Sequence, residues 1–419
     1  MIRAALISLG LVLYPATQLR FGELPVGPGE LCLIGWIGWT GMHRLLREQI
    51  RWNAALSHLL AFWLVLGLAQ CVGMIVGLVV EPYQDTAAVV HDIWAYALLI
   101  TVGFLLALEL AEDARRRRTV SLVVYFGALV LTVQVVDGFG LIGVARTDPW
   151  FFDRFRGWSL DPNQLGLLAA ALSLLSLHLL DTKLRVGGRI AVAICGTIAF
   201  SVGLLTKSDS YVICIMVAGG VLFGRKAWTA LSQVGNRRTL AHALFVSALL
   251  ALPLAAIAAV PFAQSAIGYL ELQSNAVYEE DGQGDTRLAL WTEAFEKGLQ
   301  SGFLGFGPGP HLTSKSYKRP PPDKFESHNT TLDLFTQGGL AAVLIFVWLC
   351  ASTVVRSWRA KLPALIGLAV GLTAFSMFHL VIRHPMFWFG IVLCLLESAR
   401  ATQSVPAGPR LRLVQRHSA

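Results

Sequence analysis

The sequence predicts an all-α integral membrane protein of about twelve transmembrane helices, with a long polar loop between the ninth and the tenth. Of its 419 residues, 55% are hydrophobic and 14% are charged, whereas a soluble domain carries about a quarter charged residues. Stretches near the length that crosses a bilayer, about 20 mainly apolar residues, recur along the chain. The expected spans are residues 2–19, 28–42, 58–80, 88–110, 119–137, 163–180, 189–206, 210–224, 240–262, 330–355, 362–380 and 385–398.

The positions of Lys and Arg predict which side each link faces. Links after the even-numbered spans, together with the two ends of the chain, hold 22 of the 34 Lys and Arg residues. Short basic links stay in the cytoplasm, so we expect both termini inside and the long loop outside. Basic links beside anionic lipid also explain most of the net charge of +8, which therefore requires no nucleic-acid partner.

The six cysteines all fall within expected spans. They predict neither a disulfide framework nor a thiolate metal site, and we expect them to be small buried packing residues. The chain then divides into helices one to nine over 1–262 with an outer loop at 138–162, a polar loop over 263–328, helices ten to twelve over 329–399, and a tail over 400–419.

The outer loop 138–162 mixes charged and aromatic residues, which is typical of a segment at the membrane interface. Its arginines are candidates for binding an anion: Arg146, Arg154 and Arg156. Neighbouring carboxylates are alternative partners for two of them: Asp148 and Asp153. Lys207 and Asp209 lie in the next outer link, where ionisable groups at the membrane boundary are either paired or functional. An ion pair between those two residues is the alternative interpretation.

The long polar loop contains one segment with helical spacing, over 286–299, behind Asp285 as the expected N-cap. Its apolar residues repeat at three or four positions: Leu288, Trp291, Phe295 and Leu299. The acidic stretch 279–285 lacks the spacing of a calcium loop, so a solvated turn is favoured over a cation site. Residues 305–309 (Gly-Phe-Gly-Pro-Gly) turn the chain, and they follow a helix, so they are no nucleotide fingerprint.

Two residues of this loop are the main candidates for chemistry. His328 stands at the mouth of the tenth span, which Ser327 or Asn329 is placed to cap. An imidazole accepts a proton from a hydroxyl group near neutral pH; the alternative is a histidine that only hydrogen-bonds the loop. Arg287 opens the amphipathic helix, where a cation opposes the helix dipole. A diphosphate would account for it, because guanidinium binds phosphate oxygens in a fork, and a salt bridge to Asp285 or Glu293 is the alternative.

In chain order, four segments resemble motifs of the O-antigen ligase and O-antigen polymerase family of bacterial envelope glycosyltransferases. They are 156–166 (the Arg…Pro-Asn entry to a span), 204–209 (a short Ser-Arg turn), 287–291 with 305–309 (the outer-loop signature), and 327–332 with 338–339 (the His-Asn helix start). The resemblance covers about residues 163–345, and the twelve-span layout extends it along the chain.

Members of this family move a glycan from an undecaprenyl diphosphate carrier to a hydroxyl acceptor on the periplasmic side of the bacterial inner membrane. The resemblance implies a GT-C-like fold and an inverting transfer without metal or cofactor, in which the acceptor is a glycan or lipid A core. Carried over to this chain, Arg287 holds the diphosphate, His328 is the candidate base, and Asn329 joins the substrate-binding residues. Fixed cations stabilise the negative charge that develops on the departing diphosphate.

One departure from the family concerns the short turn, where arginine usually follows serine. Here Asp209 follows Ser208, while Lys207 precedes it. The candidates to supply the missing charge are Lys207, Arg154, Arg156 and Arg383. The choice between ligase and polymerase stays open.

Two other functional classes fit parts of the sequence. A transporter or flippase for a lipid-linked sugar commonly has repeated halves and Gly- or Pro-broken helices near the bilayer midplane, and neither is clear here. A non-enzymatic partner in an envelope complex is supported only by the basic tail. The sequence favours the transferase, as a multi-pass protein with its site toward the periplasm.

Overall fold

The structure is a computed structural model that describes residues 1–21, 26–47, 51–81, 85–144, 147–182, 184–232, 284–313 and 324–403. Several expectations lie outside the described residues: the ninth span at 240–262, Arg146, most of the acidic stretch 279–285 and the end of the tail. The backbone of 284–287 is described without its side chains, so the contacts of the Arg287 side chain also stay outside.

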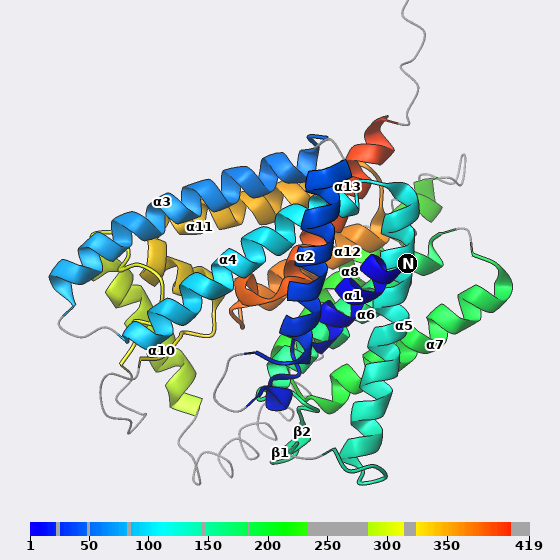
Figure 1. Cartoon of the computed structure of the whole chain (residues 1–419), viewed down its shortest axis with the longest axis horizontal. Helices are drawn as coiled ribbons and strands as arrows, with labels where there is room; N and C mark the ends of the chain where they lie inside the picture. Colours follow the sequence, from blue (N-terminus) through cyan, green and yellow to red (C-terminus); the bar gives the residue numbers. More distant parts are fainter. Residues whose placement is uncertain are drawn as a thin grey trace, which may run out of the picture.

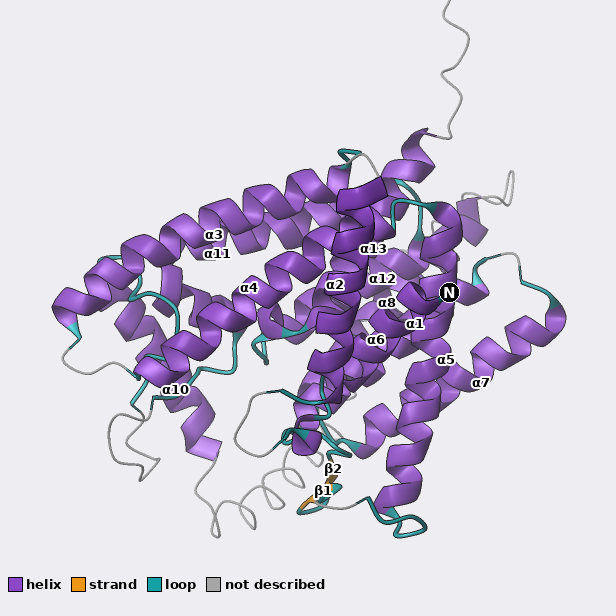
Figure 2. Cartoon of the chain, viewed as in Figure 1, coloured by secondary structure: helices purple, strands orange, loops and turns teal. Residues whose placement is uncertain are grey.

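Helices make up most of the described chain (Figures 1 and 2). They are α1 (Ile2–Leu13), α2 (Pro28–Arg47), α3 (Ala54–Val80), α4 (Thr86–Glu109), α5 (Asp113–Gly138), α6 (Pro162–Leu180), α7 (Val186–Leu205), α8 (Asp209–Ser232), α10 (Gly284–Gln300), α11 (Thr330–Arg359), α12 (Pro363–Ser376) and α13 (Pro385–Gln403). Short 3-10 helices are η1 (Thr17–Leu19) and η3 (Val381–Arg383). Two strands in the outer loop, β1 (Trp150–Phe151) and β2 (Arg154–Phe155), pair antiparallel.

A helix coincides with every expected span that the structure describes. Six of them are long and apolar enough to cross a membrane: α3, α4, α5, α6, α7 and α11. The all-α membrane class is thereby confirmed, and the count of twelve spans stays a prediction. The first expected span is too long, because α1 ends at Leu13, two residues before Pro15, and proline has no backbone N–H with which to continue the helix.

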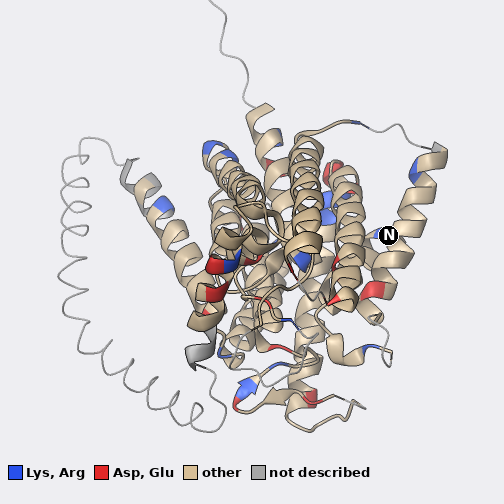
Figure 3. Cartoon of the chain, turned by 90° about the vertical axis from the view of Figure 1, so that its left-hand side faces the viewer, with Lys and Arg blue, Asp and Glu red and all other residues tan. Residues whose placement is uncertain are grey.

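The centre of the bundle is formed by α6, which packs against α7, α8 and α12. In α6, 78% of the apolar window is buried, against 22% in α7, so α7 lies at the periphery. Most of the ribbon carries no charged residue (Figure 3). The six cysteines are free, and Cys214, Cys350 and Cys394 are buried as expected, but Cys71 is exposed on α3. Because that surface of a membrane helix meets lipid, an apolar thiol is tolerated there without packing.

The basic links that were expected to share one side meet at one end of the bundle, together with the helices that begin and end the chain. Ion pairs connect them: Arg3, Arg44 and Arg115 to Glu109 at 3.6, 3.4 and 3.3 Å, Arg116 to Glu397 at 2.6 Å, and Arg400 to Asp113 at 2.5 Å. We call this end the basic end. The opposite end, which holds the C-terminus of α3 and the start of α11, is called the loop end.

At the loop end, α11 runs beside α3 and is interrupted at Gly338 and Gly339 (Figure 1). A helix break leaves backbone groups without partners, and a membrane offers no water to replace them. The loop segment 303–307 supplies the missing partners through backbone hydrogen bonds: Phe306 N to Thr336 O at 2.7 Å, Gly307 N to Gln337 O at 2.8 Å, and Leu340 N to Phe303 O at 2.9 Å. The glycine-rich turn predicted from sequence therefore forms backbone hydrogen bonds with the break in α11.

Glycine is required on both sides of this junction. Gly339 has φ 62° and ψ −156°, a conformation that is essentially confined to glycine, and a Cβ there would overlap the Phe303 carbonyl oxygen. Gly305 has φ 82°, and its Cβ would lie 2.5 Å from the Gln337 oxygen. A Gly-broken helix, which the sequence did not show clearly, is thus present, although the loop fills the break.

Candidate functional site

His328 lies in the turn that starts α11, and hydrogen bonds on both sides hold that turn. Asn329 is the N-cap, as expected for one of two candidates, and its side-chain oxygen accepts from the amides of Thr331 and Leu332 at 3.0 and 3.2 Å. The Ser327 amide donates to Asp333 Oδ1 at 2.7 Å. From the neighbouring α10, Trp291 Nε1 donates to the Ser327 carbonyl at 2.9 Å. The turn is therefore fixed by both α10 and α11.

The backbone of His328 has φ 55°, which is uncommon for a residue with a side chain. Such conformations cluster at functional sites, where the surrounding structure maintains them. Asn329 caps the helix, so this conformation of His328 does not serve capping. The ring is half-buried, and none of the described residues exchanges a hydrogen bond with it, so its nitrogens are available to another molecule.

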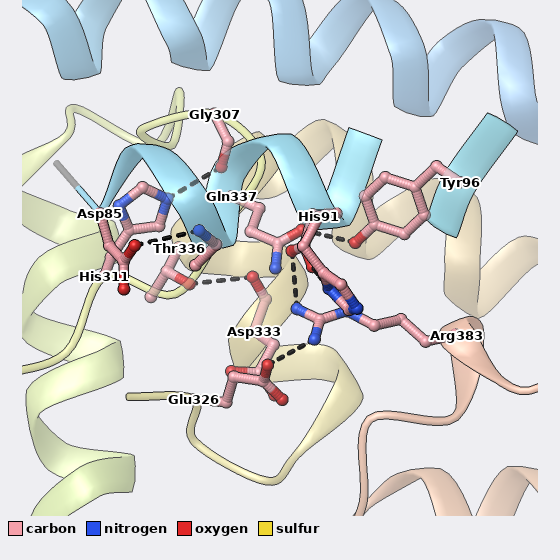
Figure 4. Close-up of polar contacts among 12 residues, drawn as sticks. Asp85, His91, Tyr96, Gly307, His311, Glu326, Asp333, Thr336, Gln337 and Arg383 are labelled. Atoms are coloured by element: carbon pink, nitrogen blue, oxygen red, sulfur yellow. Dashed lines mark hydrogen bonds and ion pairs between the residues drawn. The ribbon is translucent and has the colours of Figure 1, made fainter. Parts of the chain in front are cut away.

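Arg383 lies between two carboxylates beside this turn (Figure 4). Its Nη1 contacts Glu326 Oε1 at 2.5 Å, and its Nη2 contacts the buried Asp92 Oδ2 of α4 at 2.6 Å. Burial alone would raise the pKa of the Glu326 carboxyl, but the charges of Arg383 and then His328 lower it. Burial would likewise lower the pKa of Arg383, and the two carboxylates raise it instead. Glu326 is thus an anion whose charge interacts with that of His328.

A second polar cluster fastens α10 and the glycine-rich turn to the end of α3. His311 is buried, with Nδ1 3.0 Å from Glu81 Oε2 and Nε2 2.8 Å from the Gly307 carbonyl (Figure 4 shows the latter). Lys297 of α10 contacts Glu81 Oε1 at 3.0 Å. Burial alone would raise the pKa of Glu81, but the hydrogen bond and charge of His311, with Lys297, lower it. We call Glu81, His311 and Lys297 the latch.

A pair of buried histidines lies beside η3, in the segment that Thr330 at the start of α11 contacts. The Nε2 atoms of His379 and His384 are 3.0 Å apart, so one ring donates and the other accepts. Thr330 Oγ1 donates to the His379 carbonyl at 2.6 Å and accepts from the Val381 amide at 2.9 Å. Burial, then the charges of His379 and Arg383, place the pKa of His384 well below its usual range.

The other expected anion ligands lie where α6 and α8 begin and in the outer loop. Arg154 donates to the Thr206 carbonyl and to Asn163 Oδ1, each at 3.3 Å. Lys207 pairs with Asp153 and not with Asp209, which is exposed at the start of α8. The alternative pair predicted from the sequence is therefore wrong, because the outer loop folds back over this link.

Arg156 does have the alternative partner that the sequence offered. Its Nη2 contacts Asp148 Oδ2 at 2.6 Å, and its Nε donates to the Asp148 carbonyl at 2.9 Å. The guanidinium also lies 5.2 Å from the centre of the Phe151 ring. These contacts fold the outer loop on itself, so Arg156 has a structural role whether or not it binds substrate.

The helix expected at 286–299 is present as α10 and begins at Gly284, so Asp285 lies inside it and not at the N-cap. The alternative partner Glu293 accepts hydrogen bonds from the amide and hydroxyl of Thr313 at 2.6 and 2.7 Å. The side chain of Arg287 lies outside the described residues, so its expected role stays a prediction. Trp291, four residues later in α10, contacts the turn of His328.

Sequence reasoning missed the carboxylates that organise the loop end, Glu81, Asp92 and Glu326, and the buried histidines His311, His379 and His384. One signal was present: Asp92 lies inside an expected span and Glu81 directly follows one, and ionisable residues at such positions are paired or functional. Their partners come from residues more than 200 positions away, which spacing does not reveal.

The fold and these contacts define a multi-pass helical membrane protein whose titratable side chains at the loop end surround the start of one helix. A family model described as O-antigen ligase matches residues 195–347, from α7 into α11. Residues 195–347 thus match an O-antigen ligase domain, which supports the resemblance to the O-antigen ligase and polymerase family, whose members act in polysaccharide assembly. The match includes Lys207, Arg287 and His328, and ends before Arg383. No curated protein matches the chain.

Proposed function

We propose that this protein transfers a glycan from an undecaprenyl diphosphate carrier to a hydroxyl acceptor, as an O-antigen ligase or a polysaccharide polymerase. The observation that carries the proposal is His328, held with a positive φ by its neighbours while its ring has no hydrogen-bond partner among the described residues. A residue kept in a costly conformation without a capping role favours a function in chemistry. The acceptor is a glycan or lipid A core.

In the proposed step, the acceptor oxygen attacks the anomeric carbon, and His328 takes the hydroxyl proton. The bond between that carbon and the phosphate oxygen breaks, its electron pair leaves with the diphosphate, and the anomeric configuration inverts. Glu326 stabilises the imidazolium that forms, because its negative charge already interacts with His328. Arg287 stabilises the charge on the diphosphate, and its spacing of four residues before Trp291 in the sequence supports this role.

The remaining candidates have different support. Arg383 already pairs with two carboxylates. We therefore propose that it positions Glu326 and does not contact the diphosphate directly. Lys207 is half-exposed and pairs with one exposed carboxylate, Asp153, an arrangement that a diphosphate can displace. Lys207 is therefore the proposed second cation. The proposed site faces the periplasm from the inner membrane, as the clustering of the basic links at the opposite end supports.

The test is transfer by purified protein in liposomes, with a lipid-linked oligosaccharide as donor. We expect His328→Gln to lower kcat by about 10²- to 10⁴-fold, the usual contribution of a general base, and Arg287→Ala by about 10²- to 10³-fold. His43→Gln and Arg359→Ala, on the helix ends that belong to the basic end, are the matched controls. Full activity of both site variants would refute the site, and product length with and without lipid A core separates ligase from polymerase.

A lipid-linked sugar flippase is the second candidate, and the Gly338–Gly339 break in α11 favours it, because transporters use broken helices. In transporters, however, the freed backbone groups line a substrate cavity, whereas here the loop segment 303–307 satisfies them. Movement of a fluorescent lipid-linked sugar across the liposome bilayer, without transfer, would favour the flippase.

A further inference from the structure

A cavity of about 280 Å³ opens at the basic end, far along the helices from the proposed transfer site. Four elements enclose it: the start of α5, the end of α6 with the link that follows, the start of α12 and the end of α13. Since α5 and α6 are membrane-spanning by length and composition, their ends lie at the level where lipid headgroups meet the protein. At this level of the membrane the cavity is next to lipid headgroups.

The charged lining of the cavity leaves cationic donors available. Arg116 is committed, because Glu397, Asp113 and the Leu110 carbonyl take its three nitrogens at 2.6, 2.6 and 2.8 Å. Arg400 lines the cavity with 47% of its side chain exposed, and pairs with Asp113 through one nitrogen. Arg117 is exposed, and none of the described carboxylates pairs with it. A guanidinium carries five donors, so Arg117 and Arg400 both retain capacity for an anion.

The start of α12 adds to this capacity. Its N-cap, Leu362, provides no side-chain hydrogen bond, and Pro363 follows, so the first amides of the helix and its positive dipole end face the cavity region without a capping group. Helix starts of this kind accept phosphate oxygens. Asp181 and Glu397 are the opposing carboxylates of the lining, and Glu397 is already neutralised by Arg116.

The rest of the lining is apolar and includes Val120, Leu179, Leu184 and Leu365. A cavity whose lining includes both guanidinium groups and leucines matches a molecule that joins a phosphate to hydrocarbon. We infer that this cavity binds an anionic phospholipid, with its phosphate at Arg117, Arg400 and the start of α12, and an acyl chain on the leucines. Binding there clamps α5, α6, α12 and α13 together, and it is independent of the proposed transfer reaction.

The experiment measures lipid binding to purified protein in a zwitterionic detergent, by native mass spectrometry and by the shift in melting temperature. The probes are short-chain phosphatidylglycerol, short-chain phosphatidylcholine and inorganic phosphate. The test variant is Arg117→Gln, and the matched control is Arg118→Gln, an exposed neighbour on α5 that does not line the cavity. A second variant, Ser121→Trp, fills the cavity without changing the charge.

We expect phosphatidylglycerol to bind the native protein and Arg118→Gln equally, and Arg117→Gln about tenfold more weakly, as loss of one charge-assisted contact predicts. Ser121→Trp should also lose binding. Equal binding by the two arginine variants would overturn the site, because surface charge in general would then explain it. If inorganic phosphate binds as well as phosphatidylglycerol, or phosphatidylcholine does, the anionic lipid is the wrong ligand. None of these results depends on transfer activity.

Discussion

Replacing Gly339 by alanine tests the junction between the glycine-rich turn and α11. Its φ and ψ of 62° and −156° are costly for any other residue by about 1–3 kcal/mol. The added Cβ also overlaps the Phe303 carbonyl, which must move and give up its 2.9 Å hydrogen bond from the Leu340 amide. An unsatisfied buried pair costs a further amount of about 1–3 kcal/mol. We therefore expect Gly339→Ala to lower the free energy of unfolding by about 2–6 kcal/mol.

The assay is denaturant unfolding of the detergent-solubilised protein, read by tryptophan fluorescence, with limited proteolysis of the outer segment as a second measurement. Gly67→Ala in α3 is the matched control, because a Cβ there meets nothing within 4 Å, and helical Gly→Ala changes stabilise by about 0.5–1 kcal/mol. If Gly339→Ala is as stable as Gly67→Ala, the junction does not depend on glycine, and the interpretation of the 305–309 turn is wrong.

Three further predictions concern charged residues. Glu81→Gln should lower stability by about 1–3 kcal/mol and accelerate proteolysis of α10. Because the folded pKa of Glu81 is lowered, its stabilising effect is full above the ordinary pKa of 4.5 and is lost as pH falls through the folded value, so the variant and the native protein should unfold alike in acid. Arg383→Ala should lower the free energy of unfolding by about 3–5 kcal/mol, because two carboxylates lose their cation. Adding Asp92→Asn to this variant should restore part of the lost stability. If it restores none, Arg383 does not act through its pair with Asp92. Lys207→Ala should lower transfer while Asp209→Ala stays active, and the reverse result in the same liposome assay would show that lysine is not the second cation.

Local sequence was sufficient wherever a single segment determines its own conformation. The apolar repeat at Leu288 and Trp291 predicted α10 to within two residues at its start and one at its end. Pro15 is visible in the sequence where α1 ends, although the expected span 2–19 ran through it. Asn329 was one of two expected caps, since a side-chain oxygen before an apolar helix satisfies its first amides. Hydrophobic length likewise predicted where the membrane helices lie.

What the sequence could not predict depends on contacts between distant segments. His311 pairs with Glu81, 230 positions earlier, and neither residue stands in a recognisable motif. An ion pair of Lys207 with Asp209 was the alternative interpretation, but the hairpin of the outer loop brings Asp153 to Lys207 instead. Glycines at 305 and 339 were each noted, yet only their φ angles and mutual contact show that they form one joint. Which ion pairs form, and which backbone conformations are compatible, depends on the tertiary structure.

The hydrogen bonds between residues 303–307 and α11 limit how a bulky sugar chain could reach His328. If this segment moved away from α11, three backbone carbonyl groups would lose their hydrogen-bond donors. Unsatisfied peptide groups are very costly within a membrane. We therefore expect this segment to stay in place. Under the proposed transfer, room for a growing or incoming polymer has to come from other parts of the periphery.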